Sequence, residues 1–208
     1  FYLIDSGSGS TNNVNLLRLP TARLDGLLLT HFHSDHIAEI YEVNLGSWVN
    51  GRPAPLTVFG PRGVDEVVEG INASYRQDRI YRVGHHGEAL LPPALGVLDH
   101  KTIEPGVILD DGQLKITAYV GEHPPIEPAV GYRFDYRGRS VVISGDSNVS
   151  DSTRQITEGA DLLLHDALSL PTLTALSAAL DAAGQTRLAK IVTDVTDYHA
   201  STESLVEL

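Results

Sequence analysis

The sequence predicts a layered α/β domain with sheets covered by helices on their outer faces, and three observations support this prediction. Short apolar or alternating runs bounded by Gly, Pro or Asp recur along the chain, as β-strands do. Hairpin-like strand pairs fill the middle of the sequence, and helical patterns lie near both ends. With 208 residues the chain can bury a substantial core, so we expect a single domain over residues 1–208.

The predicted elements alternate along the chain. The runs predicted as strands cover residues 1–5, 26–30, 56–59, 114–120, 130–136, 140–144, 161–164 and 189–193. Helical periodicity covers residues 36–45, 64–75, 173–183 and 202–208, and Gly184 is placed to end the third of these helices. Asp111-Gly112 predicts a tight hairpin turn before the strand at 114–120. Residues 84–105, rich in Gly and Pro, are predicted as an irregular surface segment.

The composition argues against several classes of protein. The formal net charge of −12 is a poor match for a sequence-independent nucleic-acid binder, which needs Lys and Arg against phosphates. The absence of cysteine excludes disulfides, cysteine nucleophiles and thiolate metal sites. No apolar run approaches the roughly 20 residues needed to span a bilayer, so no membrane partner is expected.

The chain also contains no methionine, begins in a strand-like run and ends in a helical one. We therefore expect both ends to be incomplete. Residues 1–5 lack the basic-then-apolar pattern of a secretion signal, which slightly favours the cytoplasm. A signal removed from a longer precursor remains compatible with this sequence, so the compartment is left open.

The strongest chemical pattern follows the predicted strand at 26–30. His31-Phe32-His33-Ser34-Asp35-His36 holds four potential metal ligands within six residues, at the exit of an apolar strand. Imidazole and carboxylate groups are ligands that Zn²⁺, Mn²⁺ or Fe take where no thiolate is present. His31 and His33 can point to one side of an extended turn, while Asp35 and His36 begin a helix and can face a second ion. The alternative, a polar turn with chance histidines, leaves this density of ligands unexplained.

Two coordination shells need further ligands, which we expect at other strand exits. His123 follows the strand at 114–120, and Asp146 follows the strand at 140–144, where a carboxylate can bridge two cations. Either residue alone would more readily be a turn or capping residue. The motif at His31–His36 favours the metal role for both.

An acid and a histidine later in the chain predict a proton-transfer pair. Asp166 follows the run at 161–164, and His199 follows the run at 189–193, just before a helix start at Ser201 or Thr202. Asp166 would orient the imidazole and favour its protonated form, so that His199 could donate a proton to a leaving group. A polar pair with no catalytic duty is the alternative.

The ordered set of His31-x-His33-x-Asp35-His36, a lone His123 and Ser144-Gly145-Asp146 resembles the metallo-β-lactamase superfamily, most closely its ribonuclease Z-like and arylsulfatase-like hydrolases. The resemblance extends from Tyr2 to the final helix. The first motif is highly specific, and the later ones are specific in combination. The fold that the resemblance implies is a four-layer αββα sandwich, the metallo-β-lactamase fold, with the metals at one edge.

The resemblance also implies a role for each ligand. Two divalent metal ions are expected, zinc above all, with manganese or iron as alternatives. One ion would be bound by His31, His33 and His123, and the other by Asp35 and His36, with Asp146 bridging.

The implied catalytic residues carry two departures from the family pattern. His165-Asp166-Ala167 resembles the His-Glu-Ala-Thr motif of ribonuclease Z, but its carboxylate is one methylene shorter, so its reach to His199 is less secure. His199 resembles the catalytic histidine of the family, whose last metal ligand lies later in the chain. No histidine follows His199 here. Either the chain stops before that ligand, which we favour, or His199 takes its place.

The chemistry implied is two-metal hydrolysis through a metal-bridging hydroxide, with Asp35 able to accept a proton and His199 to donate one. Two divalent ions outweigh the negative charge of Asp35, Asp146 and one hydroxide, which favours a small anionic phosphodiester or sulfate ester. Ribonuclease Z enzymes that process tRNA precursors usually carry a long arm between the lone histidine and the bridging aspartate. Here His123 and Asp146 are only 23 positions apart, so a nucleic-acid substrate is disfavoured.

Three other functions stay open. They are a β-lactamase- or lactonase-like amide or ester hydrolase, a tRNA 3′-processing endonuclease, and a metal-binding domain without turnover. His85 and His86, in a Gly-flanked segment, are predicted to line the substrate mouth, with loop packing as an equally favoured alternative. Dimers are common in the family that the chain resembles, so a homodimer is the one protein partner considered.

Overall fold

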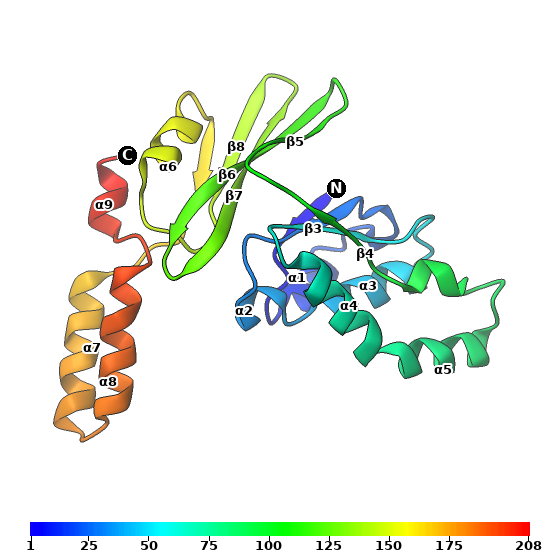
Figure 1. Ribbon diagram of the computed structural model, residues 1–208, viewed down its shortest axis with the longest axis horizontal. Coiled ribbons are helices and arrows are strands. Elements are labelled where there is room, and N and C mark those ends of the chain that lie inside the picture. The colour runs from blue at the N-terminus through cyan, green and yellow to red at the C-terminus, as the bar shows by residue number, and fades with distance from the viewer. The chain divides into compact units, whose positions relative to one another are not determined.

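The computed structural model describes residues 1–208, which form two compact units, Phe1–Ile103 and Glu104–Leu208. Each unit contains one β-sheet with its own helices (Figure 1). The expectation of a single domain over the whole chain stays a prediction.

The sheet of the first unit is parallel throughout, with strand order β1-β2-β3-β4. Its strands are β1 (Tyr2–Ile4), β2 (Gly26–Leu28), β3 (Thr57–Gly60) and β4 (Asp99–Thr102). Strand β2 is buried along its whole length, as its continuous apolar sequence predicts for a central parallel strand. Because parallel strands end at the same edge of a sheet, residues that follow β1 and β2 lie close together.

The helices of the first unit pack against this sheet through a core of aliphatic side chains. They are α1 (Ser10–Leu16), α2 (Ser34–Ile37), α3 (Ile40–Val49), α4 (Val64–Ser74) and α5 (Arg76–His86), with short 3₁₀ turns η1 (Thr21–Arg23) and η2 (Pro93–Gly96). Leu27 and Val58 of the sheet are completely buried with Ile40 of α3 and Val64 and Val68 of α4. Burial of this kind stabilises by roughly 1.5–3 kcal/mol per large aliphatic side chain and fixes the edge from which the candidate ligands project.

The sheet of the second unit has strand order β5-β6-β7-β8-β9. Its strands are β5 (Gly106–Asp110), β6 (Leu114–His123), β7 (Ile126–Tyr136), β8 (Arg139–Ile143) and β9 (Leu162–Leu164). Strands β5 to β8 form an antiparallel meander, and β9 pairs with β8 in parallel. Strands β6, β8 and β9 therefore run in one direction and end at the same edge of the sheet. The turn at Asp111-Gly112 joins β5 to β6 as predicted, with Gly112 at φ 82°.

The helices of the second unit are α6 (Asp151–Thr157), α7 (Leu170–Ala182), α8 (Thr186–Asp194) and α9 (Thr202–Val206), with a 3₁₀ turn η3 (Val195–Asp197). Helix α6 begins with a capping box between Ser150 and Thr153 and packs on β6. Helices α7 and α8 form an antiparallel hairpin that extends from the rest of the unit (Figure 1). No helix in the structure has the length and apolar character required to cross a membrane.

Two predictions of secondary structure are wrong. Residues 189–193 form part of helix α8 and not a strand. Helix α8 packs on α7, where the Ser177 hydroxyl donates to the Ala189 carbonyl and is hydrogen-bonded to the Thr193 hydroxyl. An apolar run of five residues does not by itself distinguish the two structures. Residues 84–105 are not irregular throughout, since they include the end of α5 and all of β4. The expected helix at 36–45 is also divided between α2 and α3.

Candidate metal centre

The candidate ligand segment of the first unit lies between a buried strand and a short helix. After β2, the Leu29 amide still donates to the Phe59 carbonyl, and α2 begins at Ser34. His31 is almost completely buried, whereas the side chain of Asp35 is 76% exposed. The segment therefore runs from the core to the surface, which places imidazole and carboxylate groups along a path that an ion and a substrate can reach.

Asp5 is the hydrogen-bonding centre of this segment, and sequence reasoning missed it. Its carboxylate accepts from the backbone amide and the hydroxyl of Thr30, each at 2.8 Å, and from Nδ1 of His36 at 2.7 Å. Since the Thr30 hydroxyl uses its one hydrogen on Asp5, its oxygen accepts from Nδ1 of His31 at 3.0 Å. A neutral His31 and a neutral His36 thus carry their protons on Nδ1, and Nε2 is the nitrogen with the lone pair, which is the form that metal ligands take.

The signal that could have identified Asp5 is its position. It directly follows β1, as His31 follows β2 by a few residues, and the two strands are adjacent and parallel. Asp5 also has φ 55°, an uncommon backbone conformation for a residue with a side chain. In sequence, a carboxylate just after a strand is interpreted as a turn residue. Its role becomes visible only when the neighbouring strand of the sheet is known.

His31 and His33 face each other across the turn. Nε2 of His31 lies 2.9 Å from Nδ1 of His33, and the ring of His36 lies 4.2 Å from that of His31, centroid to centroid. Two nitrogens bound to one tetrahedral zinc ion at about 2.0–2.1 Å are roughly 3.3 Å apart. The observed spacing is close to that value, so the donor atoms of this pair fit a single divalent ion. With imidazole and carboxylate donors and no thiolate, the residues present suit zinc, manganese or iron.

Gly7 permits a close backbone approach beside the candidate ligands. A Cβ atom at position 7 would lie 1.9 Å from the carbonyl oxygen of Asp35. The neighbouring amide of Ser6 donates to the His36 carbonyl at 2.7 Å, and that of Glu39 donates to the Ser6 carbonyl at 2.8 Å. The loop after β1 is therefore tied along α2, and only glycine fits at its closest point.

In the second unit, His123 ends β6 at an irregularity in the pairing with β7, between Gly121 and His123. Such a bulge turns a side chain away from its regular direction. The ring is buried, and its Nδ1 donates to the Tyr198 carbonyl at 3.0 Å. As in the first unit, a backbone or carboxylate acceptor fixes the tautomer in which Nε2 carries the lone pair.

Asp146, Asp166 and His199 are brought together in the second unit. Asp146 follows β8 and Asp166 follows β9, at the edge where β6 also ends. Nδ1 of His199 lies 2.8 Å from Oδ2 of Asp166, and Nε2 of His199 lies 3.8 Å from Oδ2 of Asp146. The donor atoms of these three residues lie within 4.8 Å of one another. The shorter carboxylate of Asp166 therefore does reach His199.

Two further polar groups surround Asp166. Burial lowers the pKa of His165, because it opposes the charged form. The bonds of His165 to Asp166 have a larger combined effect and hold this pKa above its usual value. Nδ1 of His165 lies 2.9 Å from the Asp166 carboxylate. Burial and the negative charge of Asp166 both raise the pKa of the Tyr119 hydroxyl. Asp166 thus lies in a protected environment where an ionised carboxylate acts strongly on its neighbours.

His85 and His86 do not join the ligands of the first unit. They form the last turn of helix α5, both exposed, with ring centroids 6.2 Å apart. Figure 1 shows that α5 lies at the other end of this unit from α2. The predicted Gly-flanked loop is wrong, because the segment is helical. Their assignment to the substrate mouth stays a prediction without support from the geometry of the first unit.

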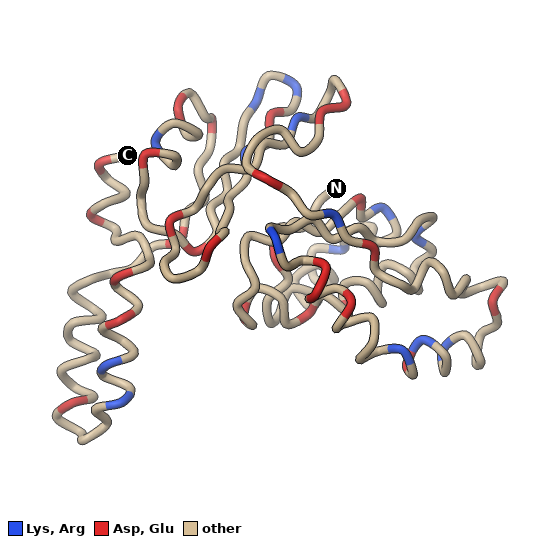
Figure 2. The backbone as a smooth tube through the Cα atoms, in the orientation of Figure 1, with Lys and Arg blue, Asp and Glu red and all other residues tan.

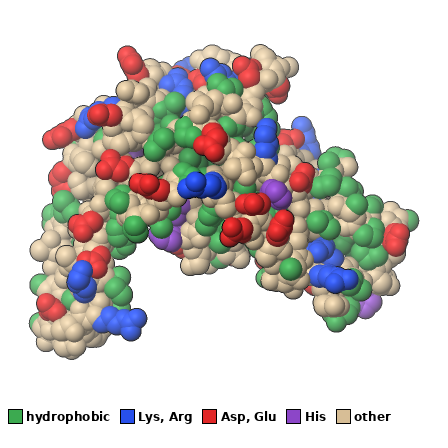
Figure 3. All heavy atoms as spheres, in the orientation of Figure 1, with side chains coloured by type: hydrophobic (Ala, Val, Ile, Leu, Met, Phe, Trp, Pro, Cys, Tyr) green, Lys and Arg blue, Asp and Glu red, His purple; other side chains and the backbone are tan.

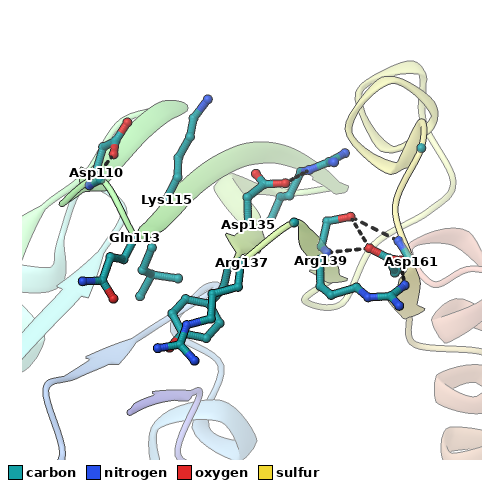
Figure 4. Close-up of a pocket in the computed structure, with 14 residues that line it drawn as sticks. Asp110, Gln113, Lys115, Asp135, Arg137, Arg139 and Asp161 are labelled. Atoms are coloured by element: carbon teal, nitrogen blue, oxygen red, sulfur yellow. Dashed lines mark hydrogen bonds and ion pairs between the residues drawn. The ribbon is translucent and has the colours of Figure 1, made fainter.

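The second unit also has a polar hollow of about 750 Å³ at the opposite end of its sheet (Figure 4). Four of the charged groups that line it form two ion pairs: Arg133 with Asp135 at 3.1 Å, and Arg139 with Asp161 at 2.6 Å. It is lined by the beginnings of β6 and β8 and the end of β7, whereas the candidate residues lie where β6, β8 and β9 end. None of the candidate residues lines it.

The chain was compared with protein families and with known proteins. The family model described as "Beta-lactamase superfamily domain" matches residues 2–204. A ribonuclease Z of Mycobacterium bovis is 35% identical over 203 residues, which cover 96% of this chain and 68% of that protein. A ribonuclease Z of Mycobacterium avium is 32% identical over 205 residues, covering 97% and 68%.

Solved structures show the same fold at lower identity. The human tRNase Z short form has a TM-score of 0.55 and 20% identity, over 97% of this chain and 82% of that one. A metallo-β-lactamase fold protein of Bacillus subtilis has a TM-score of 0.60 and 22% identity, over 81% and 59%. The chain thus spans about two thirds of the length of the curated relatives and less than two thirds of the Bacillus protein.

Proposed function

The chain belongs to the β-lactamase superfamily, and from that premise we propose that it is a two-metal phosphodiester hydrolase in which His199 protonates the leaving group. Membership confirms the expected family resemblance, the α/β metallo-β-lactamase fold class and the assignment as a hydrolase. The substrate, the metal and the role of each residue are parts of the proposal.

The proposed ligand set is the one that the family resemblance implies. It consists of His31, His33, Asp35, His36, His123 and Asp146. The support is chemical: His31, His36 and His123 each have Nδ1 placed to donate to a fixed acceptor, which is the tautomer that ligation through Nε2 requires. Two divalent ions in such a set would polarise the phosphorus centre and lower the pKa of a bound water.

The observation that carries the proposal is the pair of Asp166 and His199. The 2.8 Å bond from Nδ1 to Asp166 fixes the imidazole and directs Nε2 toward Asp146. A protonated Nε2 beside a proposed metal ligand is placed to give its proton to a departing alkoxide. Phosphodiesters with alcohol leaving groups need this proton, because an alkoxide leaves poorly at neutral pH.

A phosphodiester is favoured over a sulfate ester by the relatives. The curated proteins that are about a third identical over nearly the whole chain are named ribonuclease Z, an enzyme name that implies cleavage of phosphodiester bonds in RNA. A small phosphodiester is favoured over tRNA because β7 and β8 are joined by the tight turn at Arg137-Gly138, so nothing is inserted between His123 and Asp146. The net charge of −12 agrees with this preference.

The test compares two phosphodiesters that differ only in the leaving group, one a nitrophenol and the other a simple alcohol. His199→Ala should lower kcat by about 10²–10⁴ for the alcohol substrate and far less for nitrophenolate, which leaves without a proton. Metal content measured by atomic emission should be unchanged. Asp166→Asn should give a smaller loss with the same dependence on the leaving group, and Asp181→Asn, an exposed carboxylate of α7, serves as the control.

Equal losses for both leaving groups would contradict the proposed role of His199. Hydrolysis of a chromogenic cephalosporin or a lactone, with no activity on either phosphodiester, would replace the proposal with the amide or ester hydrolase alternative. A tRNA precursor is included as a second candidate substrate because of the relatives' names. Cleavage of that precursor at a rate above that of the small diesters would show that the missing arm is not required.

A further inference from the structure

The loop that carries His199 is bonded to one other segment on both sides of the histidine. It lies between the 3₁₀ turn η3 and helix α9. The Asp197 carbonyl accepts from the side chain of Asn148 at 2.9 Å. The Ala200 amide donates to the Ser147 carbonyl at 3.0 Å. Two consecutive residues, Ser147 and Asn148, therefore hold the loop just before and just after its imidazole.

The pair Ser147-Asn148 is also bonded to the end of β6. The Glu122 amide donates to the Ser147 hydroxyl oxygen at 2.9 Å, and the Asn148 amide donates to the Glu122 carbonyl at 2.8 Å. Glu122 directly precedes His123, and Ser147 directly follows Asp146. The pair thus joins the loop of the proposed proton donor to the segments that carry two proposed metal ligands.

Acidic side chains are frequent around the strand ends to which this loop is bonded. Acidic residues recur in the segments where β6 ends and where α8 returns to the sheet (Figure 2). Acidic side chains are also scattered over this unit on the face that Figure 3 shows. Glu122, Asp146, Asp166 and Asp197 all belong to the segments that meet here. Carboxylates on adjoining segments repel one another, so hydrogen bonds have to hold the backbone of the loop in place.

We propose that Asn148 is a positioning residue, which holds the His199 loop so that Nε2 of His199 stays directed toward Asp146. This inference rests on the proposed role of His199 as the proton donor. The 2.8 Å bond to Asp166 fixes the imidazole ring but not the backbone that carries it. Because a displacement of about 1 Å can cost up to about 10²-fold in rate, the position of the backbone matters as much as the orientation of the ring.

Asn148 offers a bond that can be removed without unfolding the unit. Its side chain is half-buried, and its bond to the Asp197 carbonyl lies at the surface. Water can replace that donor and satisfy the carbonyl, but it does not hold the loop at a fixed position. Ser147 is 1% exposed, and its hydroxyl both accepts from the Glu122 amide and donates to the Asn148 carbonyl. Removal of that hydroxyl would leave a part-buried amide without its partner and disturb the fold itself.

The first test uses the two phosphodiesters that differ in their leaving group. Asn148→Ala should lower kcat for the alcohol substrate by about 3–10-fold, as expected for one hydrogen bond, and leave KM unchanged. The nitrophenyl substrate should be hydrolysed as by the wild type, because its leaving group needs no proton. Asn148→Leu, which keeps the volume but lacks the donor, should lose as much as Asn148→Ala. Asn50→Ala is the matched control, since Asn50 also donates from its side chain in a surface bond, to the Gly46 carbonyl at 2.7 Å.

A double variant shows whether Asn148 acts through His199. In a His199→Ala chain, adding Asn148→Ala should cost nothing further, because no imidazole is left to position. Hydrogen–deuterium exchange gives a readout that does not depend on hydrolysis. The amides of residues 197–202 should exchange faster in Asn148→Ala and at the wild-type rate in Asn50→Ala.

Three results would overturn the proposal: losses that multiply in the double variant, a wild-type kcat in Asn148→Leu, or unchanged exchange at residues 197–202 in Asn148→Ala. A failure of the proposed function gives a different result, namely equal losses for both substrates in His199→Ala. In that case the exchange rates alone decide whether Asn148 holds the loop.

Discussion

Replacing Asp5 with Asn changes one carboxylate oxygen to an amide group and should weaken metal binding without removing any ligand. The amide can still accept from the Thr30 backbone, but its NH₂ group then faces the Nδ1 hydrogen of His36 and the Thr30 hydroxyl. Two donors cannot share a hydrogen bond. His36 is therefore driven to the tautomer with its proton on Nε2, which no longer offers a lone pair to an ion from that nitrogen.

The magnitude follows from the bonds that are lost. A hydrogen bond to a charged acceptor contributes about 1.5–3 kcal/mol, and the bond between His36 and Asp5 is short at 2.7 Å. If this amount is taken from metal binding, affinity falls by roughly 10–100-fold, which agrees with the usual effect of changing a residue that orients a metal-binding histidine. Some general destabilisation accompanies it, since the Thr30 hydroxyl also loses its acceptor.

The measurement is a competition titration of zinc against a chromogenic chelator, with metal-free wild type and Asp5→Asn at the same pH. Asp65→Asn, an exposed carboxylate on α4, is the control for removing one negative charge. Thermal unfolding of the metal-free proteins separates loss of affinity from loss of folding. An Asp5→Asn chain that is folded and binds zinc as tightly as the wild type would refute the reasoning that Asp5 fixes the tautomer of His36.

Three other predictions concern the surroundings of the same segment. Gly7→Ala should lower both the free energy of unfolding and the metal affinity, because its Cβ would lie 1.9 Å from the Asp35 carbonyl oxygen. Gly84→Ala in α5 is the control, since a Cβ there meets nothing within 4 Å. In urea unfolding, Gly84→Ala should be neutral or stabilising by up to about 1 kcal/mol. Glu39 accepts from the amides of Gly9 and Thr11, bonds that lower its pKa, so Glu39→Gln should cost about 1 kcal/mol near neutral pH. The lowered pKa of Glu39 stabilises the fold at pH values above the unfolded pKa near 4.5. The difference in free energy of unfolding between wild type and Glu39→Gln should therefore shrink as the pH falls below that value. A difference that is independent of pH would contradict this prediction. Chelation of bound metal should lower the melting temperature of the wild type, and readdition of zinc should restore it, whereas an unchanged melting temperature would show that the ligands bind no ion in the folded chain.

The sequence alone determined the elements with strong local signals. Apolar runs bounded by Gly, Pro and Asp gave the strands around Leu27, Val58 and Val142, and the ligand density of His31–His36 marked the chemistry without any knowledge of the fold. It did not determine residues 189–193, because a short apolar run fits a buried strand as well as a helix packed on a partner. The contact with α7 through Ser177 decides between them, and that contact is invisible in a local window.

The tertiary structure decided which polar residues meet. Asp5 looks like an ordinary turn residue in sequence, and it becomes the acceptor for His36 only because β1 and β2 pair in parallel and end together. Asp166 and His199 are 33 positions apart and are joined at 2.8 Å because the α7–α8 hairpin returns the chain to the end of β9. Residue types set which chemistry is available, since imidazole and carboxylate carry it wherever they lie. Distance and orientation come from strand order, which depends on pairings between segments far apart in the chain.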